Sequence, residues 1–207
     1  MSRGPTLTTT SYAILSLLAV KPWSSYGLTQ QMDRSIRPIW PRATSKLYEE
    51  PKKLVTHGLA RAKNERVGQR PRTMYSITPK GRRALAAWLR EPGEGPVLEF
   101  EQLLKVTFAE NGTKSDALRT LAASRAWAEE RNNENRSILR AYVDGVGPFQ
   151  ERAAQNILEG RFLTDFYAMV ADWADWATDM VGQWPDNPRE APLSQEAIEE
   201  IARRAEW

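Results

Sequence analysis

The Pro/Gly-rich stretch Pro92–Pro96 is the feature that most limits how this chain can fold. Because Pro and Gly interrupt helices and strands, a segment that combines them is typical of a linker between folded parts. With 207 residues in total, the chain can bury a hydrophobic core on each side of that linker. We therefore expect an N-terminal domain over residues 1–92 and a C-terminal domain over residues 97–207.

The two sides of the linker carry opposite charge. Residues 1–92 contain 17 Lys+Arg and 5 Asp+Glu, a net charge of +12, whereas the rest of the chain contains 12 basic and 21 acidic residues, a net charge of −9. A small domain this basic attracts a polyphosphate, whereas an acidic domain is repelled from one and is better suited to bind protein or small molecules. Charge alone would also fit RNA or an anionic membrane.

Cysteine is absent from the sequence, which excludes zinc ribbons, iron–sulfur clusters, thiol catalysis and disulfides. The N-terminus has no apolar signal region. The longest apolar run, Ala13–Val20, is far shorter than the roughly 20 residues that span a bilayer. We therefore expect a cytoplasmic protein that does not associate with membranes.

The first part of the basic half, residues 8–57, has apolar residues at helical spacing. Apolar residues at helical spacing predict one helix over Thr8–Val20 and a second that begins after Ser24 or Ser25, whose hydroxyl would cap it. A third helix is predicted over 43–57, ending at Gly58, a residue that favours the left-handed conformation found after helices. Three short helices are therefore expected in succession.

A change of period follows these helices. Residues 59–77 alternate weakly between apolar and polar, and turn-forming residues lie at 67–71, a pattern that predicts a β-hairpin. Thr78 and Pro79 then provide the N-cap and first position of another helix. Helix, helix, helix, hairpin, helix is the order of a winged helix-turn-helix, in which the third helix enters the major groove of DNA and the hairpin contacts the flanking backbone or minor groove.

A series of short motifs points to a known family. In chain order they are Ala13–Leu18, Ser25–Leu28, Leu47-Tyr48, Leu54 with Gly58-Leu59, and Arg72–Gly81. In this series the sequence resembles the PadR-like transcriptional regulators over roughly residues 10–90. The resemblance implies a homodimeric winged-helix regulator of the repressor type, often autoregulatory or effector-responsive, whose C-terminal helices dimerise. One departure is Pro51, which stands where the family usually has a core leucine. Because Pro removes a helical hydrogen bond, we expect a kink or a shortened N-terminal turn there.

The third helix carries the candidate DNA-binding residues. Its N-terminal part is the part that such helices place against base edges, and the candidates there are Arg42, Thr44, Ser45, Lys46 and Tyr48. Further along the helix, Lys52 and Lys53 are expected to contact phosphates. A merely solvated helix face is the alternative, but the net charge of +12 favours DNA.

The tip of the hairpin is a second candidate DNA-binding element. It carries Arg66, Gln69, Arg70 and Arg72, and guanidinium groups on a projecting ribbon suit phosphates and narrow minor grooves. The alternative is an edge hairpin that uses charge to avoid aggregation.

The acidic half predicts helices over 99–110, from Thr113 to about Val143, over about 149–184, and over a tail from Leu193 to Trp207. The third of these contains apolar residues at alternating spacings of four and three, a heptad seam that requires a partner helix: Phe162, Phe166, Met169, Trp173, Trp176 and Met180. A second copy of the chain is the commonest partner, so we expect a homodimer interface here. The predicted fold is mainly α-helical with a small β-hairpin wing, an N-terminal winged helix-turn-helix and a C-terminal α-helical dimerisation domain.

Tryptophan is abundant in this half, and an aromatic small-molecule effector could stack on Trp127, Trp173, Trp176 and Trp184. Packing in a core or interface is the favoured interpretation of these residues. Asp172, Asp175 and Asp179 lie on one helical face and could hold a cation, but a solvated acidic face is favoured in a chain with one histidine and no cysteine.

We therefore expect no catalytic site, cofactor or metal. The predicted function is a sequence-specific regulator of transcription, a homodimeric repressor on a pseudo-palindromic operator in double-stranded DNA that an effector could release. A winged-helix protein-interaction module without specific DNA binding is the alternative.

Overall fold

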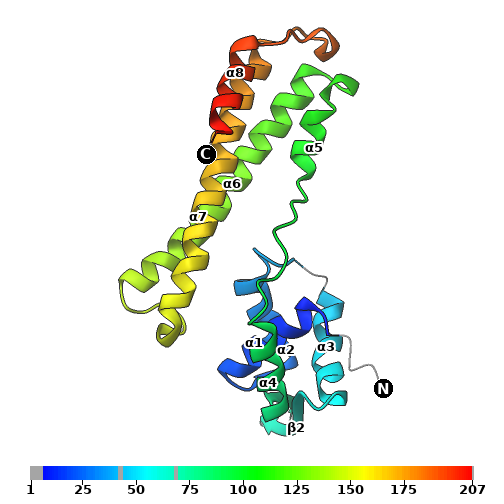
Figure 1. Cartoon of the computed structure of the whole chain (residues 1–207), viewed down its shortest axis with the longest axis vertical. Coiled ribbons are helices and arrows are strands. Elements are labelled where there is room, and N and C mark those ends of the chain that lie inside the picture. The colour runs from blue at the N-terminus through cyan, green and yellow to red at the C-terminus, as the bar shows by residue number, and fades with distance from the viewer. Residues whose placement is uncertain (1–6, 42–43, 68–69, 207) are drawn as a thin grey trace. The chain divides into compact units, whose positions relative to one another are not determined.

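A computed structural model describes residues 7–41, 44–67 and 70–206, without the side chains of residues 44–47, 67, 70 and 71. The chain divides into two compact units, Met1–Pro96 and Val97–Trp207 (Figure 1). The expected fold is confirmed: the described residues are mainly helical, with one small antiparallel sheet. Among them, no helix has both the length and the apolar character needed to cross a membrane.

The helices of the N-terminal unit begin where hydroxyl side chains can cap them. Thr8 accepts the backbone N–H of Ser11 at the start of α1 (Thr9–Val20), and Ser24 accepts that of Gly27 at the start of α2 (Ser25–Gln31). Such caps satisfy N–H groups that have no partner inside the helix. A short π-helix, Met32–Ile36, extends α2, and α3 spans Thr44–Thr56.

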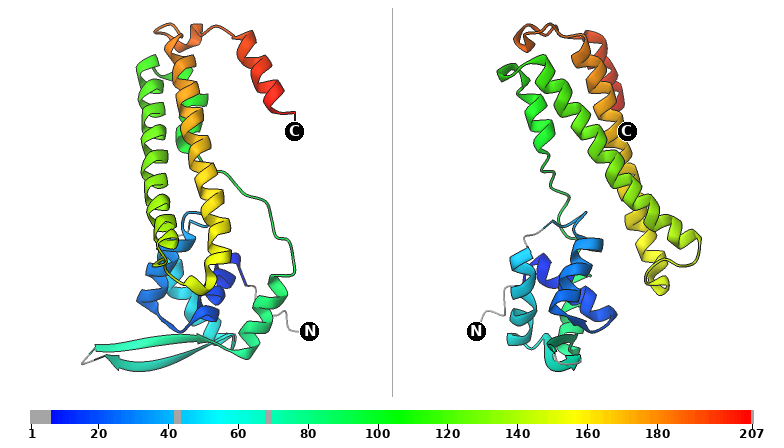
Figure 2. Two further views of the ribbon diagram at one scale, coloured as in Figure 1. Left: turned by 90° about the vertical axis from the view of Figure 1, so that its left-hand side faces the viewer. Right: turned by 180° about the vertical axis from the view of Figure 1, so that it is seen from behind.

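The sheet of this unit has three strands in the order β1-β3-β2. β2 (Ala60–Val67) and β3 (Arg70–Ile77) form the hairpin that projects from the helices in Figure 2. Their register pairs Val67 with Arg70, so Arg70 and Pro71 belong to a strand rather than to the turn predicted over 67–71. β1 (Trp23–Ser24), which the sequence did not predict, pairs with β3.

One hydrophobic core holds these elements together. It contains Ile14, Leu15 and Leu18 of α1 and Leu54 of α3, and Tyr75 of β3 packs with them. The core also receives the side of α4 (Pro79–Trp88) that faces α1, where the rings of Tyr12 and Trp88 stack with centroids 4.9 Å apart. Leu28 of α2 and Ala60 of β2 belong to the same core, which therefore holds the helices and the wing together in one unit.

Pro51 lies inside α3, and its side chain is fully buried. The helix extends back to Thr44 and continues through Pro51 to Thr56, so of the two expected effects, a kink or a shortened N-terminal turn, the shortening does not occur. The buried ring fills core space, and burial of its apolar surface contributes stability against the cost of the helical hydrogen bond that proline cannot make.

The C-terminal unit is built on two long helices. α5 (Glu101–Thr107) leads through a short turn to α6 (Lys114–Val143), and α7 (Ala153–Gly182) runs back along it, antiparallel, as Figure 1 shows. Thr113 caps α6 in a reciprocal capping box with Asp116. The chain ends with α8 (Gln195–Arg204).

The α6–α7 contact uses a regular seam. The buried residues of α7 recur at alternating spacings of three and four and comprise Gly160, Leu163, Tyr167, Val170, Ala174, Ala177 and Val181. From Leu163 onward each of them follows directly after one of the six residues of the predicted seam. α7 therefore has two adjacent heptad seams, and the one that packs inside the chain is not the one that the sequence pattern singled out.

Candidate nucleic-acid interface

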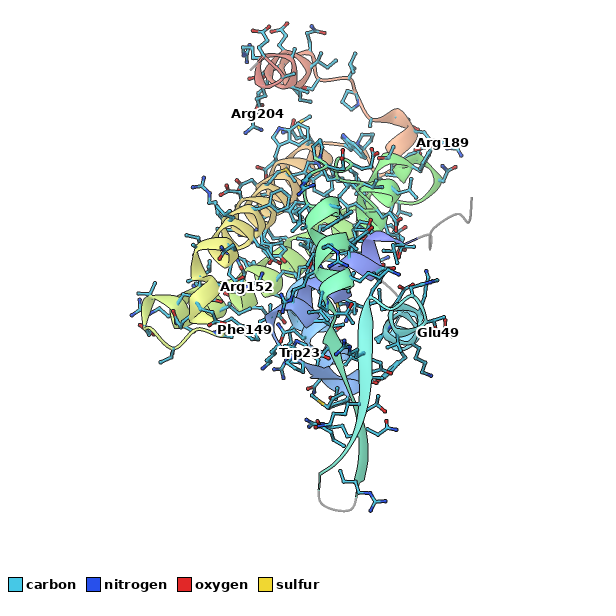
Figure 3. The ribbon with its side chains drawn as sticks, turned by 60° about the horizontal axis from the view of Figure 1, so that its bottom comes forward. Trp23, Glu49, Phe149, Arg152, Arg189 and Arg204 are labelled. Carbon is cyan, nitrogen blue, oxygen red and sulfur yellow. The ribbon has the colours of Figure 1, made fainter. Side chains whose placement is uncertain are left out.

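The outer face of α3 is the first part of the candidate interface. Thr44, Tyr48 and Lys52 follow at four-residue intervals and therefore share one face of the helix. Tyr48 is 43% exposed, and Lys52 is exposed as well. Glu49 also projects from this outer side, as Figure 3 shows. The opposite side, with Pro51 and Leu54, is buried, so the helix is held by one face and presents the other to solvent.

Several predicted contacts on α3 cannot be placed in full. Arg42 lies outside the described residues. The backbones of Thr44, Ser45 and Lys46 form the first turn of α3, but their side chains are outside the described part of the structure. The first turn is the part that meets base edges in helices of this kind, and contact of these residues with bases stays a prediction.

Lys53 differs from Lys52 in its surroundings. Its ammonium lies 3.5 Å from Glu50 Oε1, and its side chain is 36% exposed. Glu50 in turn accepts a hydrogen bond from the buried hydroxyl of Ser11 on α1. Lys53 is thus part of the contact between α3 and α1, a role that the sequence did not indicate, whereas Lys52 faces solvent.

The wing distributes its cations over two faces. Directly paired residues lie on the same face of a sheet, and alternate residues of a strand share a face. Arg72 pairs with Glu65, so it lies on the face that also carries Lys63 and Arg61, and the backbone of Arg70 places that residue there too. Arg66 pairs with Pro71 and lies on the opposite face. The predicted wing residues therefore do not form a single surface; Gln69 lies outside the described residues.

Arg61 and Lys63 are candidates that the sequence analysis missed. Both are exposed on β2 and share a face with Arg72. Lys63 also forms an ion pair with Glu65, with 3.3 Å between Lys63 Nζ and Glu65 Oε1. The signal in the sequence was their spacing of two residues, which places both side chains on one face of a strand.

The predicted dimer seam divides into an exposed part and a packed part. Phe162 and Met169 are 57% and 55% exposed, and Phe166 is half-buried. Trp173 and Trp176 instead pack against an intrachain core that includes Leu121 and Val181. Met180, at the end of the seam, is half-buried.

Trp127 of α6 lies against the exposed part of the predicted seam. The ring of Trp127 meets those of Phe166 and Tyr167 edge to face, with centroids 6.3 and 5.7 Å apart, and is 38% exposed. Phe162, Phe166 and Met169 with Trp127 form the aromatic face of the C-terminal unit. The sequence could not assign Trp127 to it, because this depends on how α6 and α7 pair.

The four tryptophans considered for an effector lie in two different places of the C-terminal unit. Trp173, Trp176 and Trp184 pack on the intrachain core, whereas Trp127 belongs to the aromatic face. A groove of about 420 Å³ runs between α5 and the start of α6, lined by residues that include Leu104, Phe108 and Ala117 but none of the four tryptophans.

The aspartates of α7 show no metal site. Asp175 accepts a hydrogen bond from Arg125 Nε at 3.0 Å, which links α7 to α6. In the described part of the chain, no three His, Asp or Glu side chains are grouped to hold a metal ion.

Residues 14–87, most of the N-terminal unit, match the model of the transcriptional regulator PadR-like family. The N-terminal unit of the chain belongs to this family. No curated protein matches the sequence of this PadR-like chain. Its fold is similar to that of PadR from Bacillus subtilis in complex with operator DNA, with a TM-score of 0.71 and 20% identity over 84% of this chain and 99% of that one.

Two further structures share the fold. PadR from Bacillus subtilis in complex with p-coumaric acid matches with a TM-score of 0.68 and 19% identity over 85% of this chain and 100% of that one. The virulence activator AphA of Vibrio cholerae matches with a TM-score of 0.62 and 23% identity over 84% of this chain and 98% of that one. The similarity extends over both units, so the helices that follow the winged helix are also arranged as in these proteins.

Proposed function

We propose that this PadR-like chain is a homodimeric repressor that binds a pseudo-palindromic operator in double-stranded DNA. The observation that carries the proposal is the outer face of α3, exposed at Tyr48 and Lys52, in a unit that also projects a cationic wing. The net charge of +12 over residues 1–92 supplies the attraction to phosphate. The complex of the similar Bacillus subtilis protein with operator DNA supports the proposal.

The parts of the interface have different roles in this proposal. The first turn of α3 and Tyr48 contact base edges and specify the sequence, through Arg42, Thr44, Ser45, Lys46 and Tyr48. Phosphate contacts set the register along the duplex, and these come from Lys52, Lys53, Arg66, Gln69, Arg70 and Arg72.

Dimerisation is assigned to the C-terminal unit. The aromatic face exposes large apolar side chains that a soluble monomer would leave in water, and a second copy can cover them. A symmetric dimer presents two copies of α3, which accounts for two half-sites about 34 Å, one helical turn of DNA, apart. A dimer bound to such a site across a promoter would block transcription, and a protein with this function works in the cytoplasm.

Release by an effector completes the proposal. The similar Bacillus subtilis protein has been solved with p-coumaric acid, an aromatic carboxylic acid. We expect this chain to respond to an aromatic small molecule too. Titration of p-coumaric acid and related acids, followed by tryptophan fluorescence and by loss of operator binding, tests this part separately.

Selection of bound sequences from a random duplex pool tests the central claim. A repressor of this kind enriches a palindromic motif, and its affinity falls by orders of magnitude between low and moderate salt. A protein-interaction module without DNA binding would enrich no motif. A reporter gene placed behind the selected operator then shows whether the protein lowers expression.

A further inference from the structure

The C-terminal end of α3 is closed by a glycine turn that leaves carbonyl groups without helical partners. Gly58 has φ of +70°, its N–H bonds to Val55 O at 2.9 Å, and Leu59 N–H bonds to Leu54 O at 2.8 Å. This is the Schellman arrangement, which satisfies the carbonyls of Leu54 and Val55. The carbonyls of His57, Gly58 and Leu59 point beyond the helix and need other donors.

The segment Thr78–Gly81, at the start of α4, supplies those donors. Thr78 Oγ1 lies 2.7 Å from Gly58 O and 3.1 Å from Leu59 O, and Thr78 N–H bonds to Leu59 O at 3.0 Å. Lys80 Nζ donates to His57 O at 2.9 Å. Gly81 allows the two segments to approach, because a Cβ at this position would collide with the carbonyl oxygen of Leu59.

These contacts lie at the base of the wing. β2 begins at Ala60, shortly after the end of α3, and β3 ends at Ile77, directly before Thr78. The bonds between Thr78–Gly81 and His57–Leu59 therefore close the hairpin onto the end of α3 and fix the angle between the two candidate DNA-binding elements. The ammonium of Lys80 also lies at the negative end of the α3 dipole, where a cation is favourable.

We propose that Lys80 is a positioning residue for DNA binding: it holds the end of α3 against the base of the wing and does not itself neutralise a phosphate. The proposal rests on the DNA-binding function argued above. Lys80 is the informative member of the network because its side chain is exposed, whereas Thr78 is buried and its loss would damage the unit as a whole. A surface lysine that contacts phosphate is the competing explanation.

The two explanations differ in their salt dependence. Loss of one phosphate contact lowers the slope of log affinity against log salt by about 0.9. Loss of a positioning contact leaves the number of neutralised phosphates, and therefore the slope, unchanged. We expect Lys80→Met to reduce affinity for the selected operator roughly two- to thirtyfold, the range for residues that couple to a site without touching the ligand, at an unaltered slope. Lys80→Arg, which keeps a cationic donor, should recover most of the loss.

Arg83→Met is the matched control, because it removes one exposed cation from the same helix without a contact to α3 among the described hydrogen bonds. Its affinity should change less than that of Lys80→Met. A reduced slope for Lys80→Met, or an affinity equal to that of the wild type, overturns the proposal.

Hydrogen exchange on the full chain without DNA gives an independent readout. Lys80→Met should accelerate exchange of the Gly58 and Leu59 amides, which close the end of α3, whereas Arg83→Met should not. Unchanged exchange at both amides also overturns the proposal. If the wild type binds no duplex, the proposed function fails, and the exchange data alone decide whether Lys80 holds α3.

Discussion

The hydroxyl of Ser11 on α1 donates a hydrogen bond to the carboxylate of Glu50 on α3, with 2.7 Å between Ser11 Oγ and Glu50 Oε2. Ser11 is fully buried, and the Glu50 side chain is only 15% exposed. A carboxylate that is mostly removed from water needs such a donor, because the loss of its hydration is otherwise uncompensated. This bond joins the inner side of the candidate recognition helix to the core.

Ser11→Ala should therefore destabilise the protein, by about 1–3 kcal/mol, the cost of leaving a buried acceptor without its partner. Thr8→Ala is the control, because Thr8 shares the capping box of α1 with Ser11 but does not contact Glu50. Chemical denaturation of both variants separates the two effects. A loss for Ser11→Ala no larger than that for Thr8→Ala would show that only the cap matters.

The sequence predicted best those features that neighbouring residues determine. Ser24 and Thr78 cap helices as expected, because each hydroxyl accepts the N–H of a residue only three positions away. The pairing of Ser11 with Glu50 was missed, since it joins residues that are distant in sequence. β1 was missed because two residues carry no detectable alternation.

The heptad seam shows a different limit of sequence-based inference. Phe162 and Leu163 each begin a series with the same alternation of four and three, so periodicity alone could not decide which series faces α6. The chain buries the series with Ala174 and Ala177, whose small side chains allow two helices to approach closely. The bulky neighbours Trp173 and Trp176 lie on the flank.

The two adjacent lysines of α3 should differ in their effects on DNA binding. Lys52→Ala should weaken binding to every duplex and lower the salt slope by about one, as loss of a phosphate contact does. Lys53→Ala should have a smaller effect on the slope, because Glu50 lies 3.5 Å from the Lys53 ammonium and competes with phosphate for it. Titration with operator and random duplexes at several salt concentrations measures both variants. Equal slopes for the two variants would contradict this distinction.

Dimerisation should depend on the exposed part of the seam. Phe162→Glu combined with Met169→Glu places charges where a partner would cover apolar side chains, so light scattering should show a folded monomer. Operator binding should fall with the dimer, because one half-site alone provides too few contacts. Asp172→Asn, on an exposed position of the same helix, serves as the control.

Trp173→Glu should behave differently from these variants. Trp173 contacts Phe100 edge to face, with ring centroids 5.5 Å apart, and packs on the intrachain core. A charge there should unfold the C-terminal unit rather than merely separate two copies. A double variant of Phe162 and Met169 that remains dimeric would place the interface elsewhere on the chain.

Glu159, near the start of α7, should make stability depend on pH. Burial raises the pKa of its carboxyl above the usual value, and the attraction of Arg152 opposes this only in part. Since the folded-state pKa is the higher one, the carboxyl contributes most to stability below its unfolded-state pKa. That contribution is lost as the pH rises through the raised folded-state value.

Glu159→Gln removes the charge that the folded state disfavours. The variant should therefore be more stable than the wild type at pH 7, and the difference should shrink as the pH is lowered to about 4, near the usual pKa of a glutamate. Denaturant unfolding of both proteins across this range measures the difference, with Glu151→Gln, an exposed neighbour, as the control. If Glu159→Gln were instead less stable at pH 7, the attraction between Glu159 and Arg152 would outweigh the cost of burying the carboxylate.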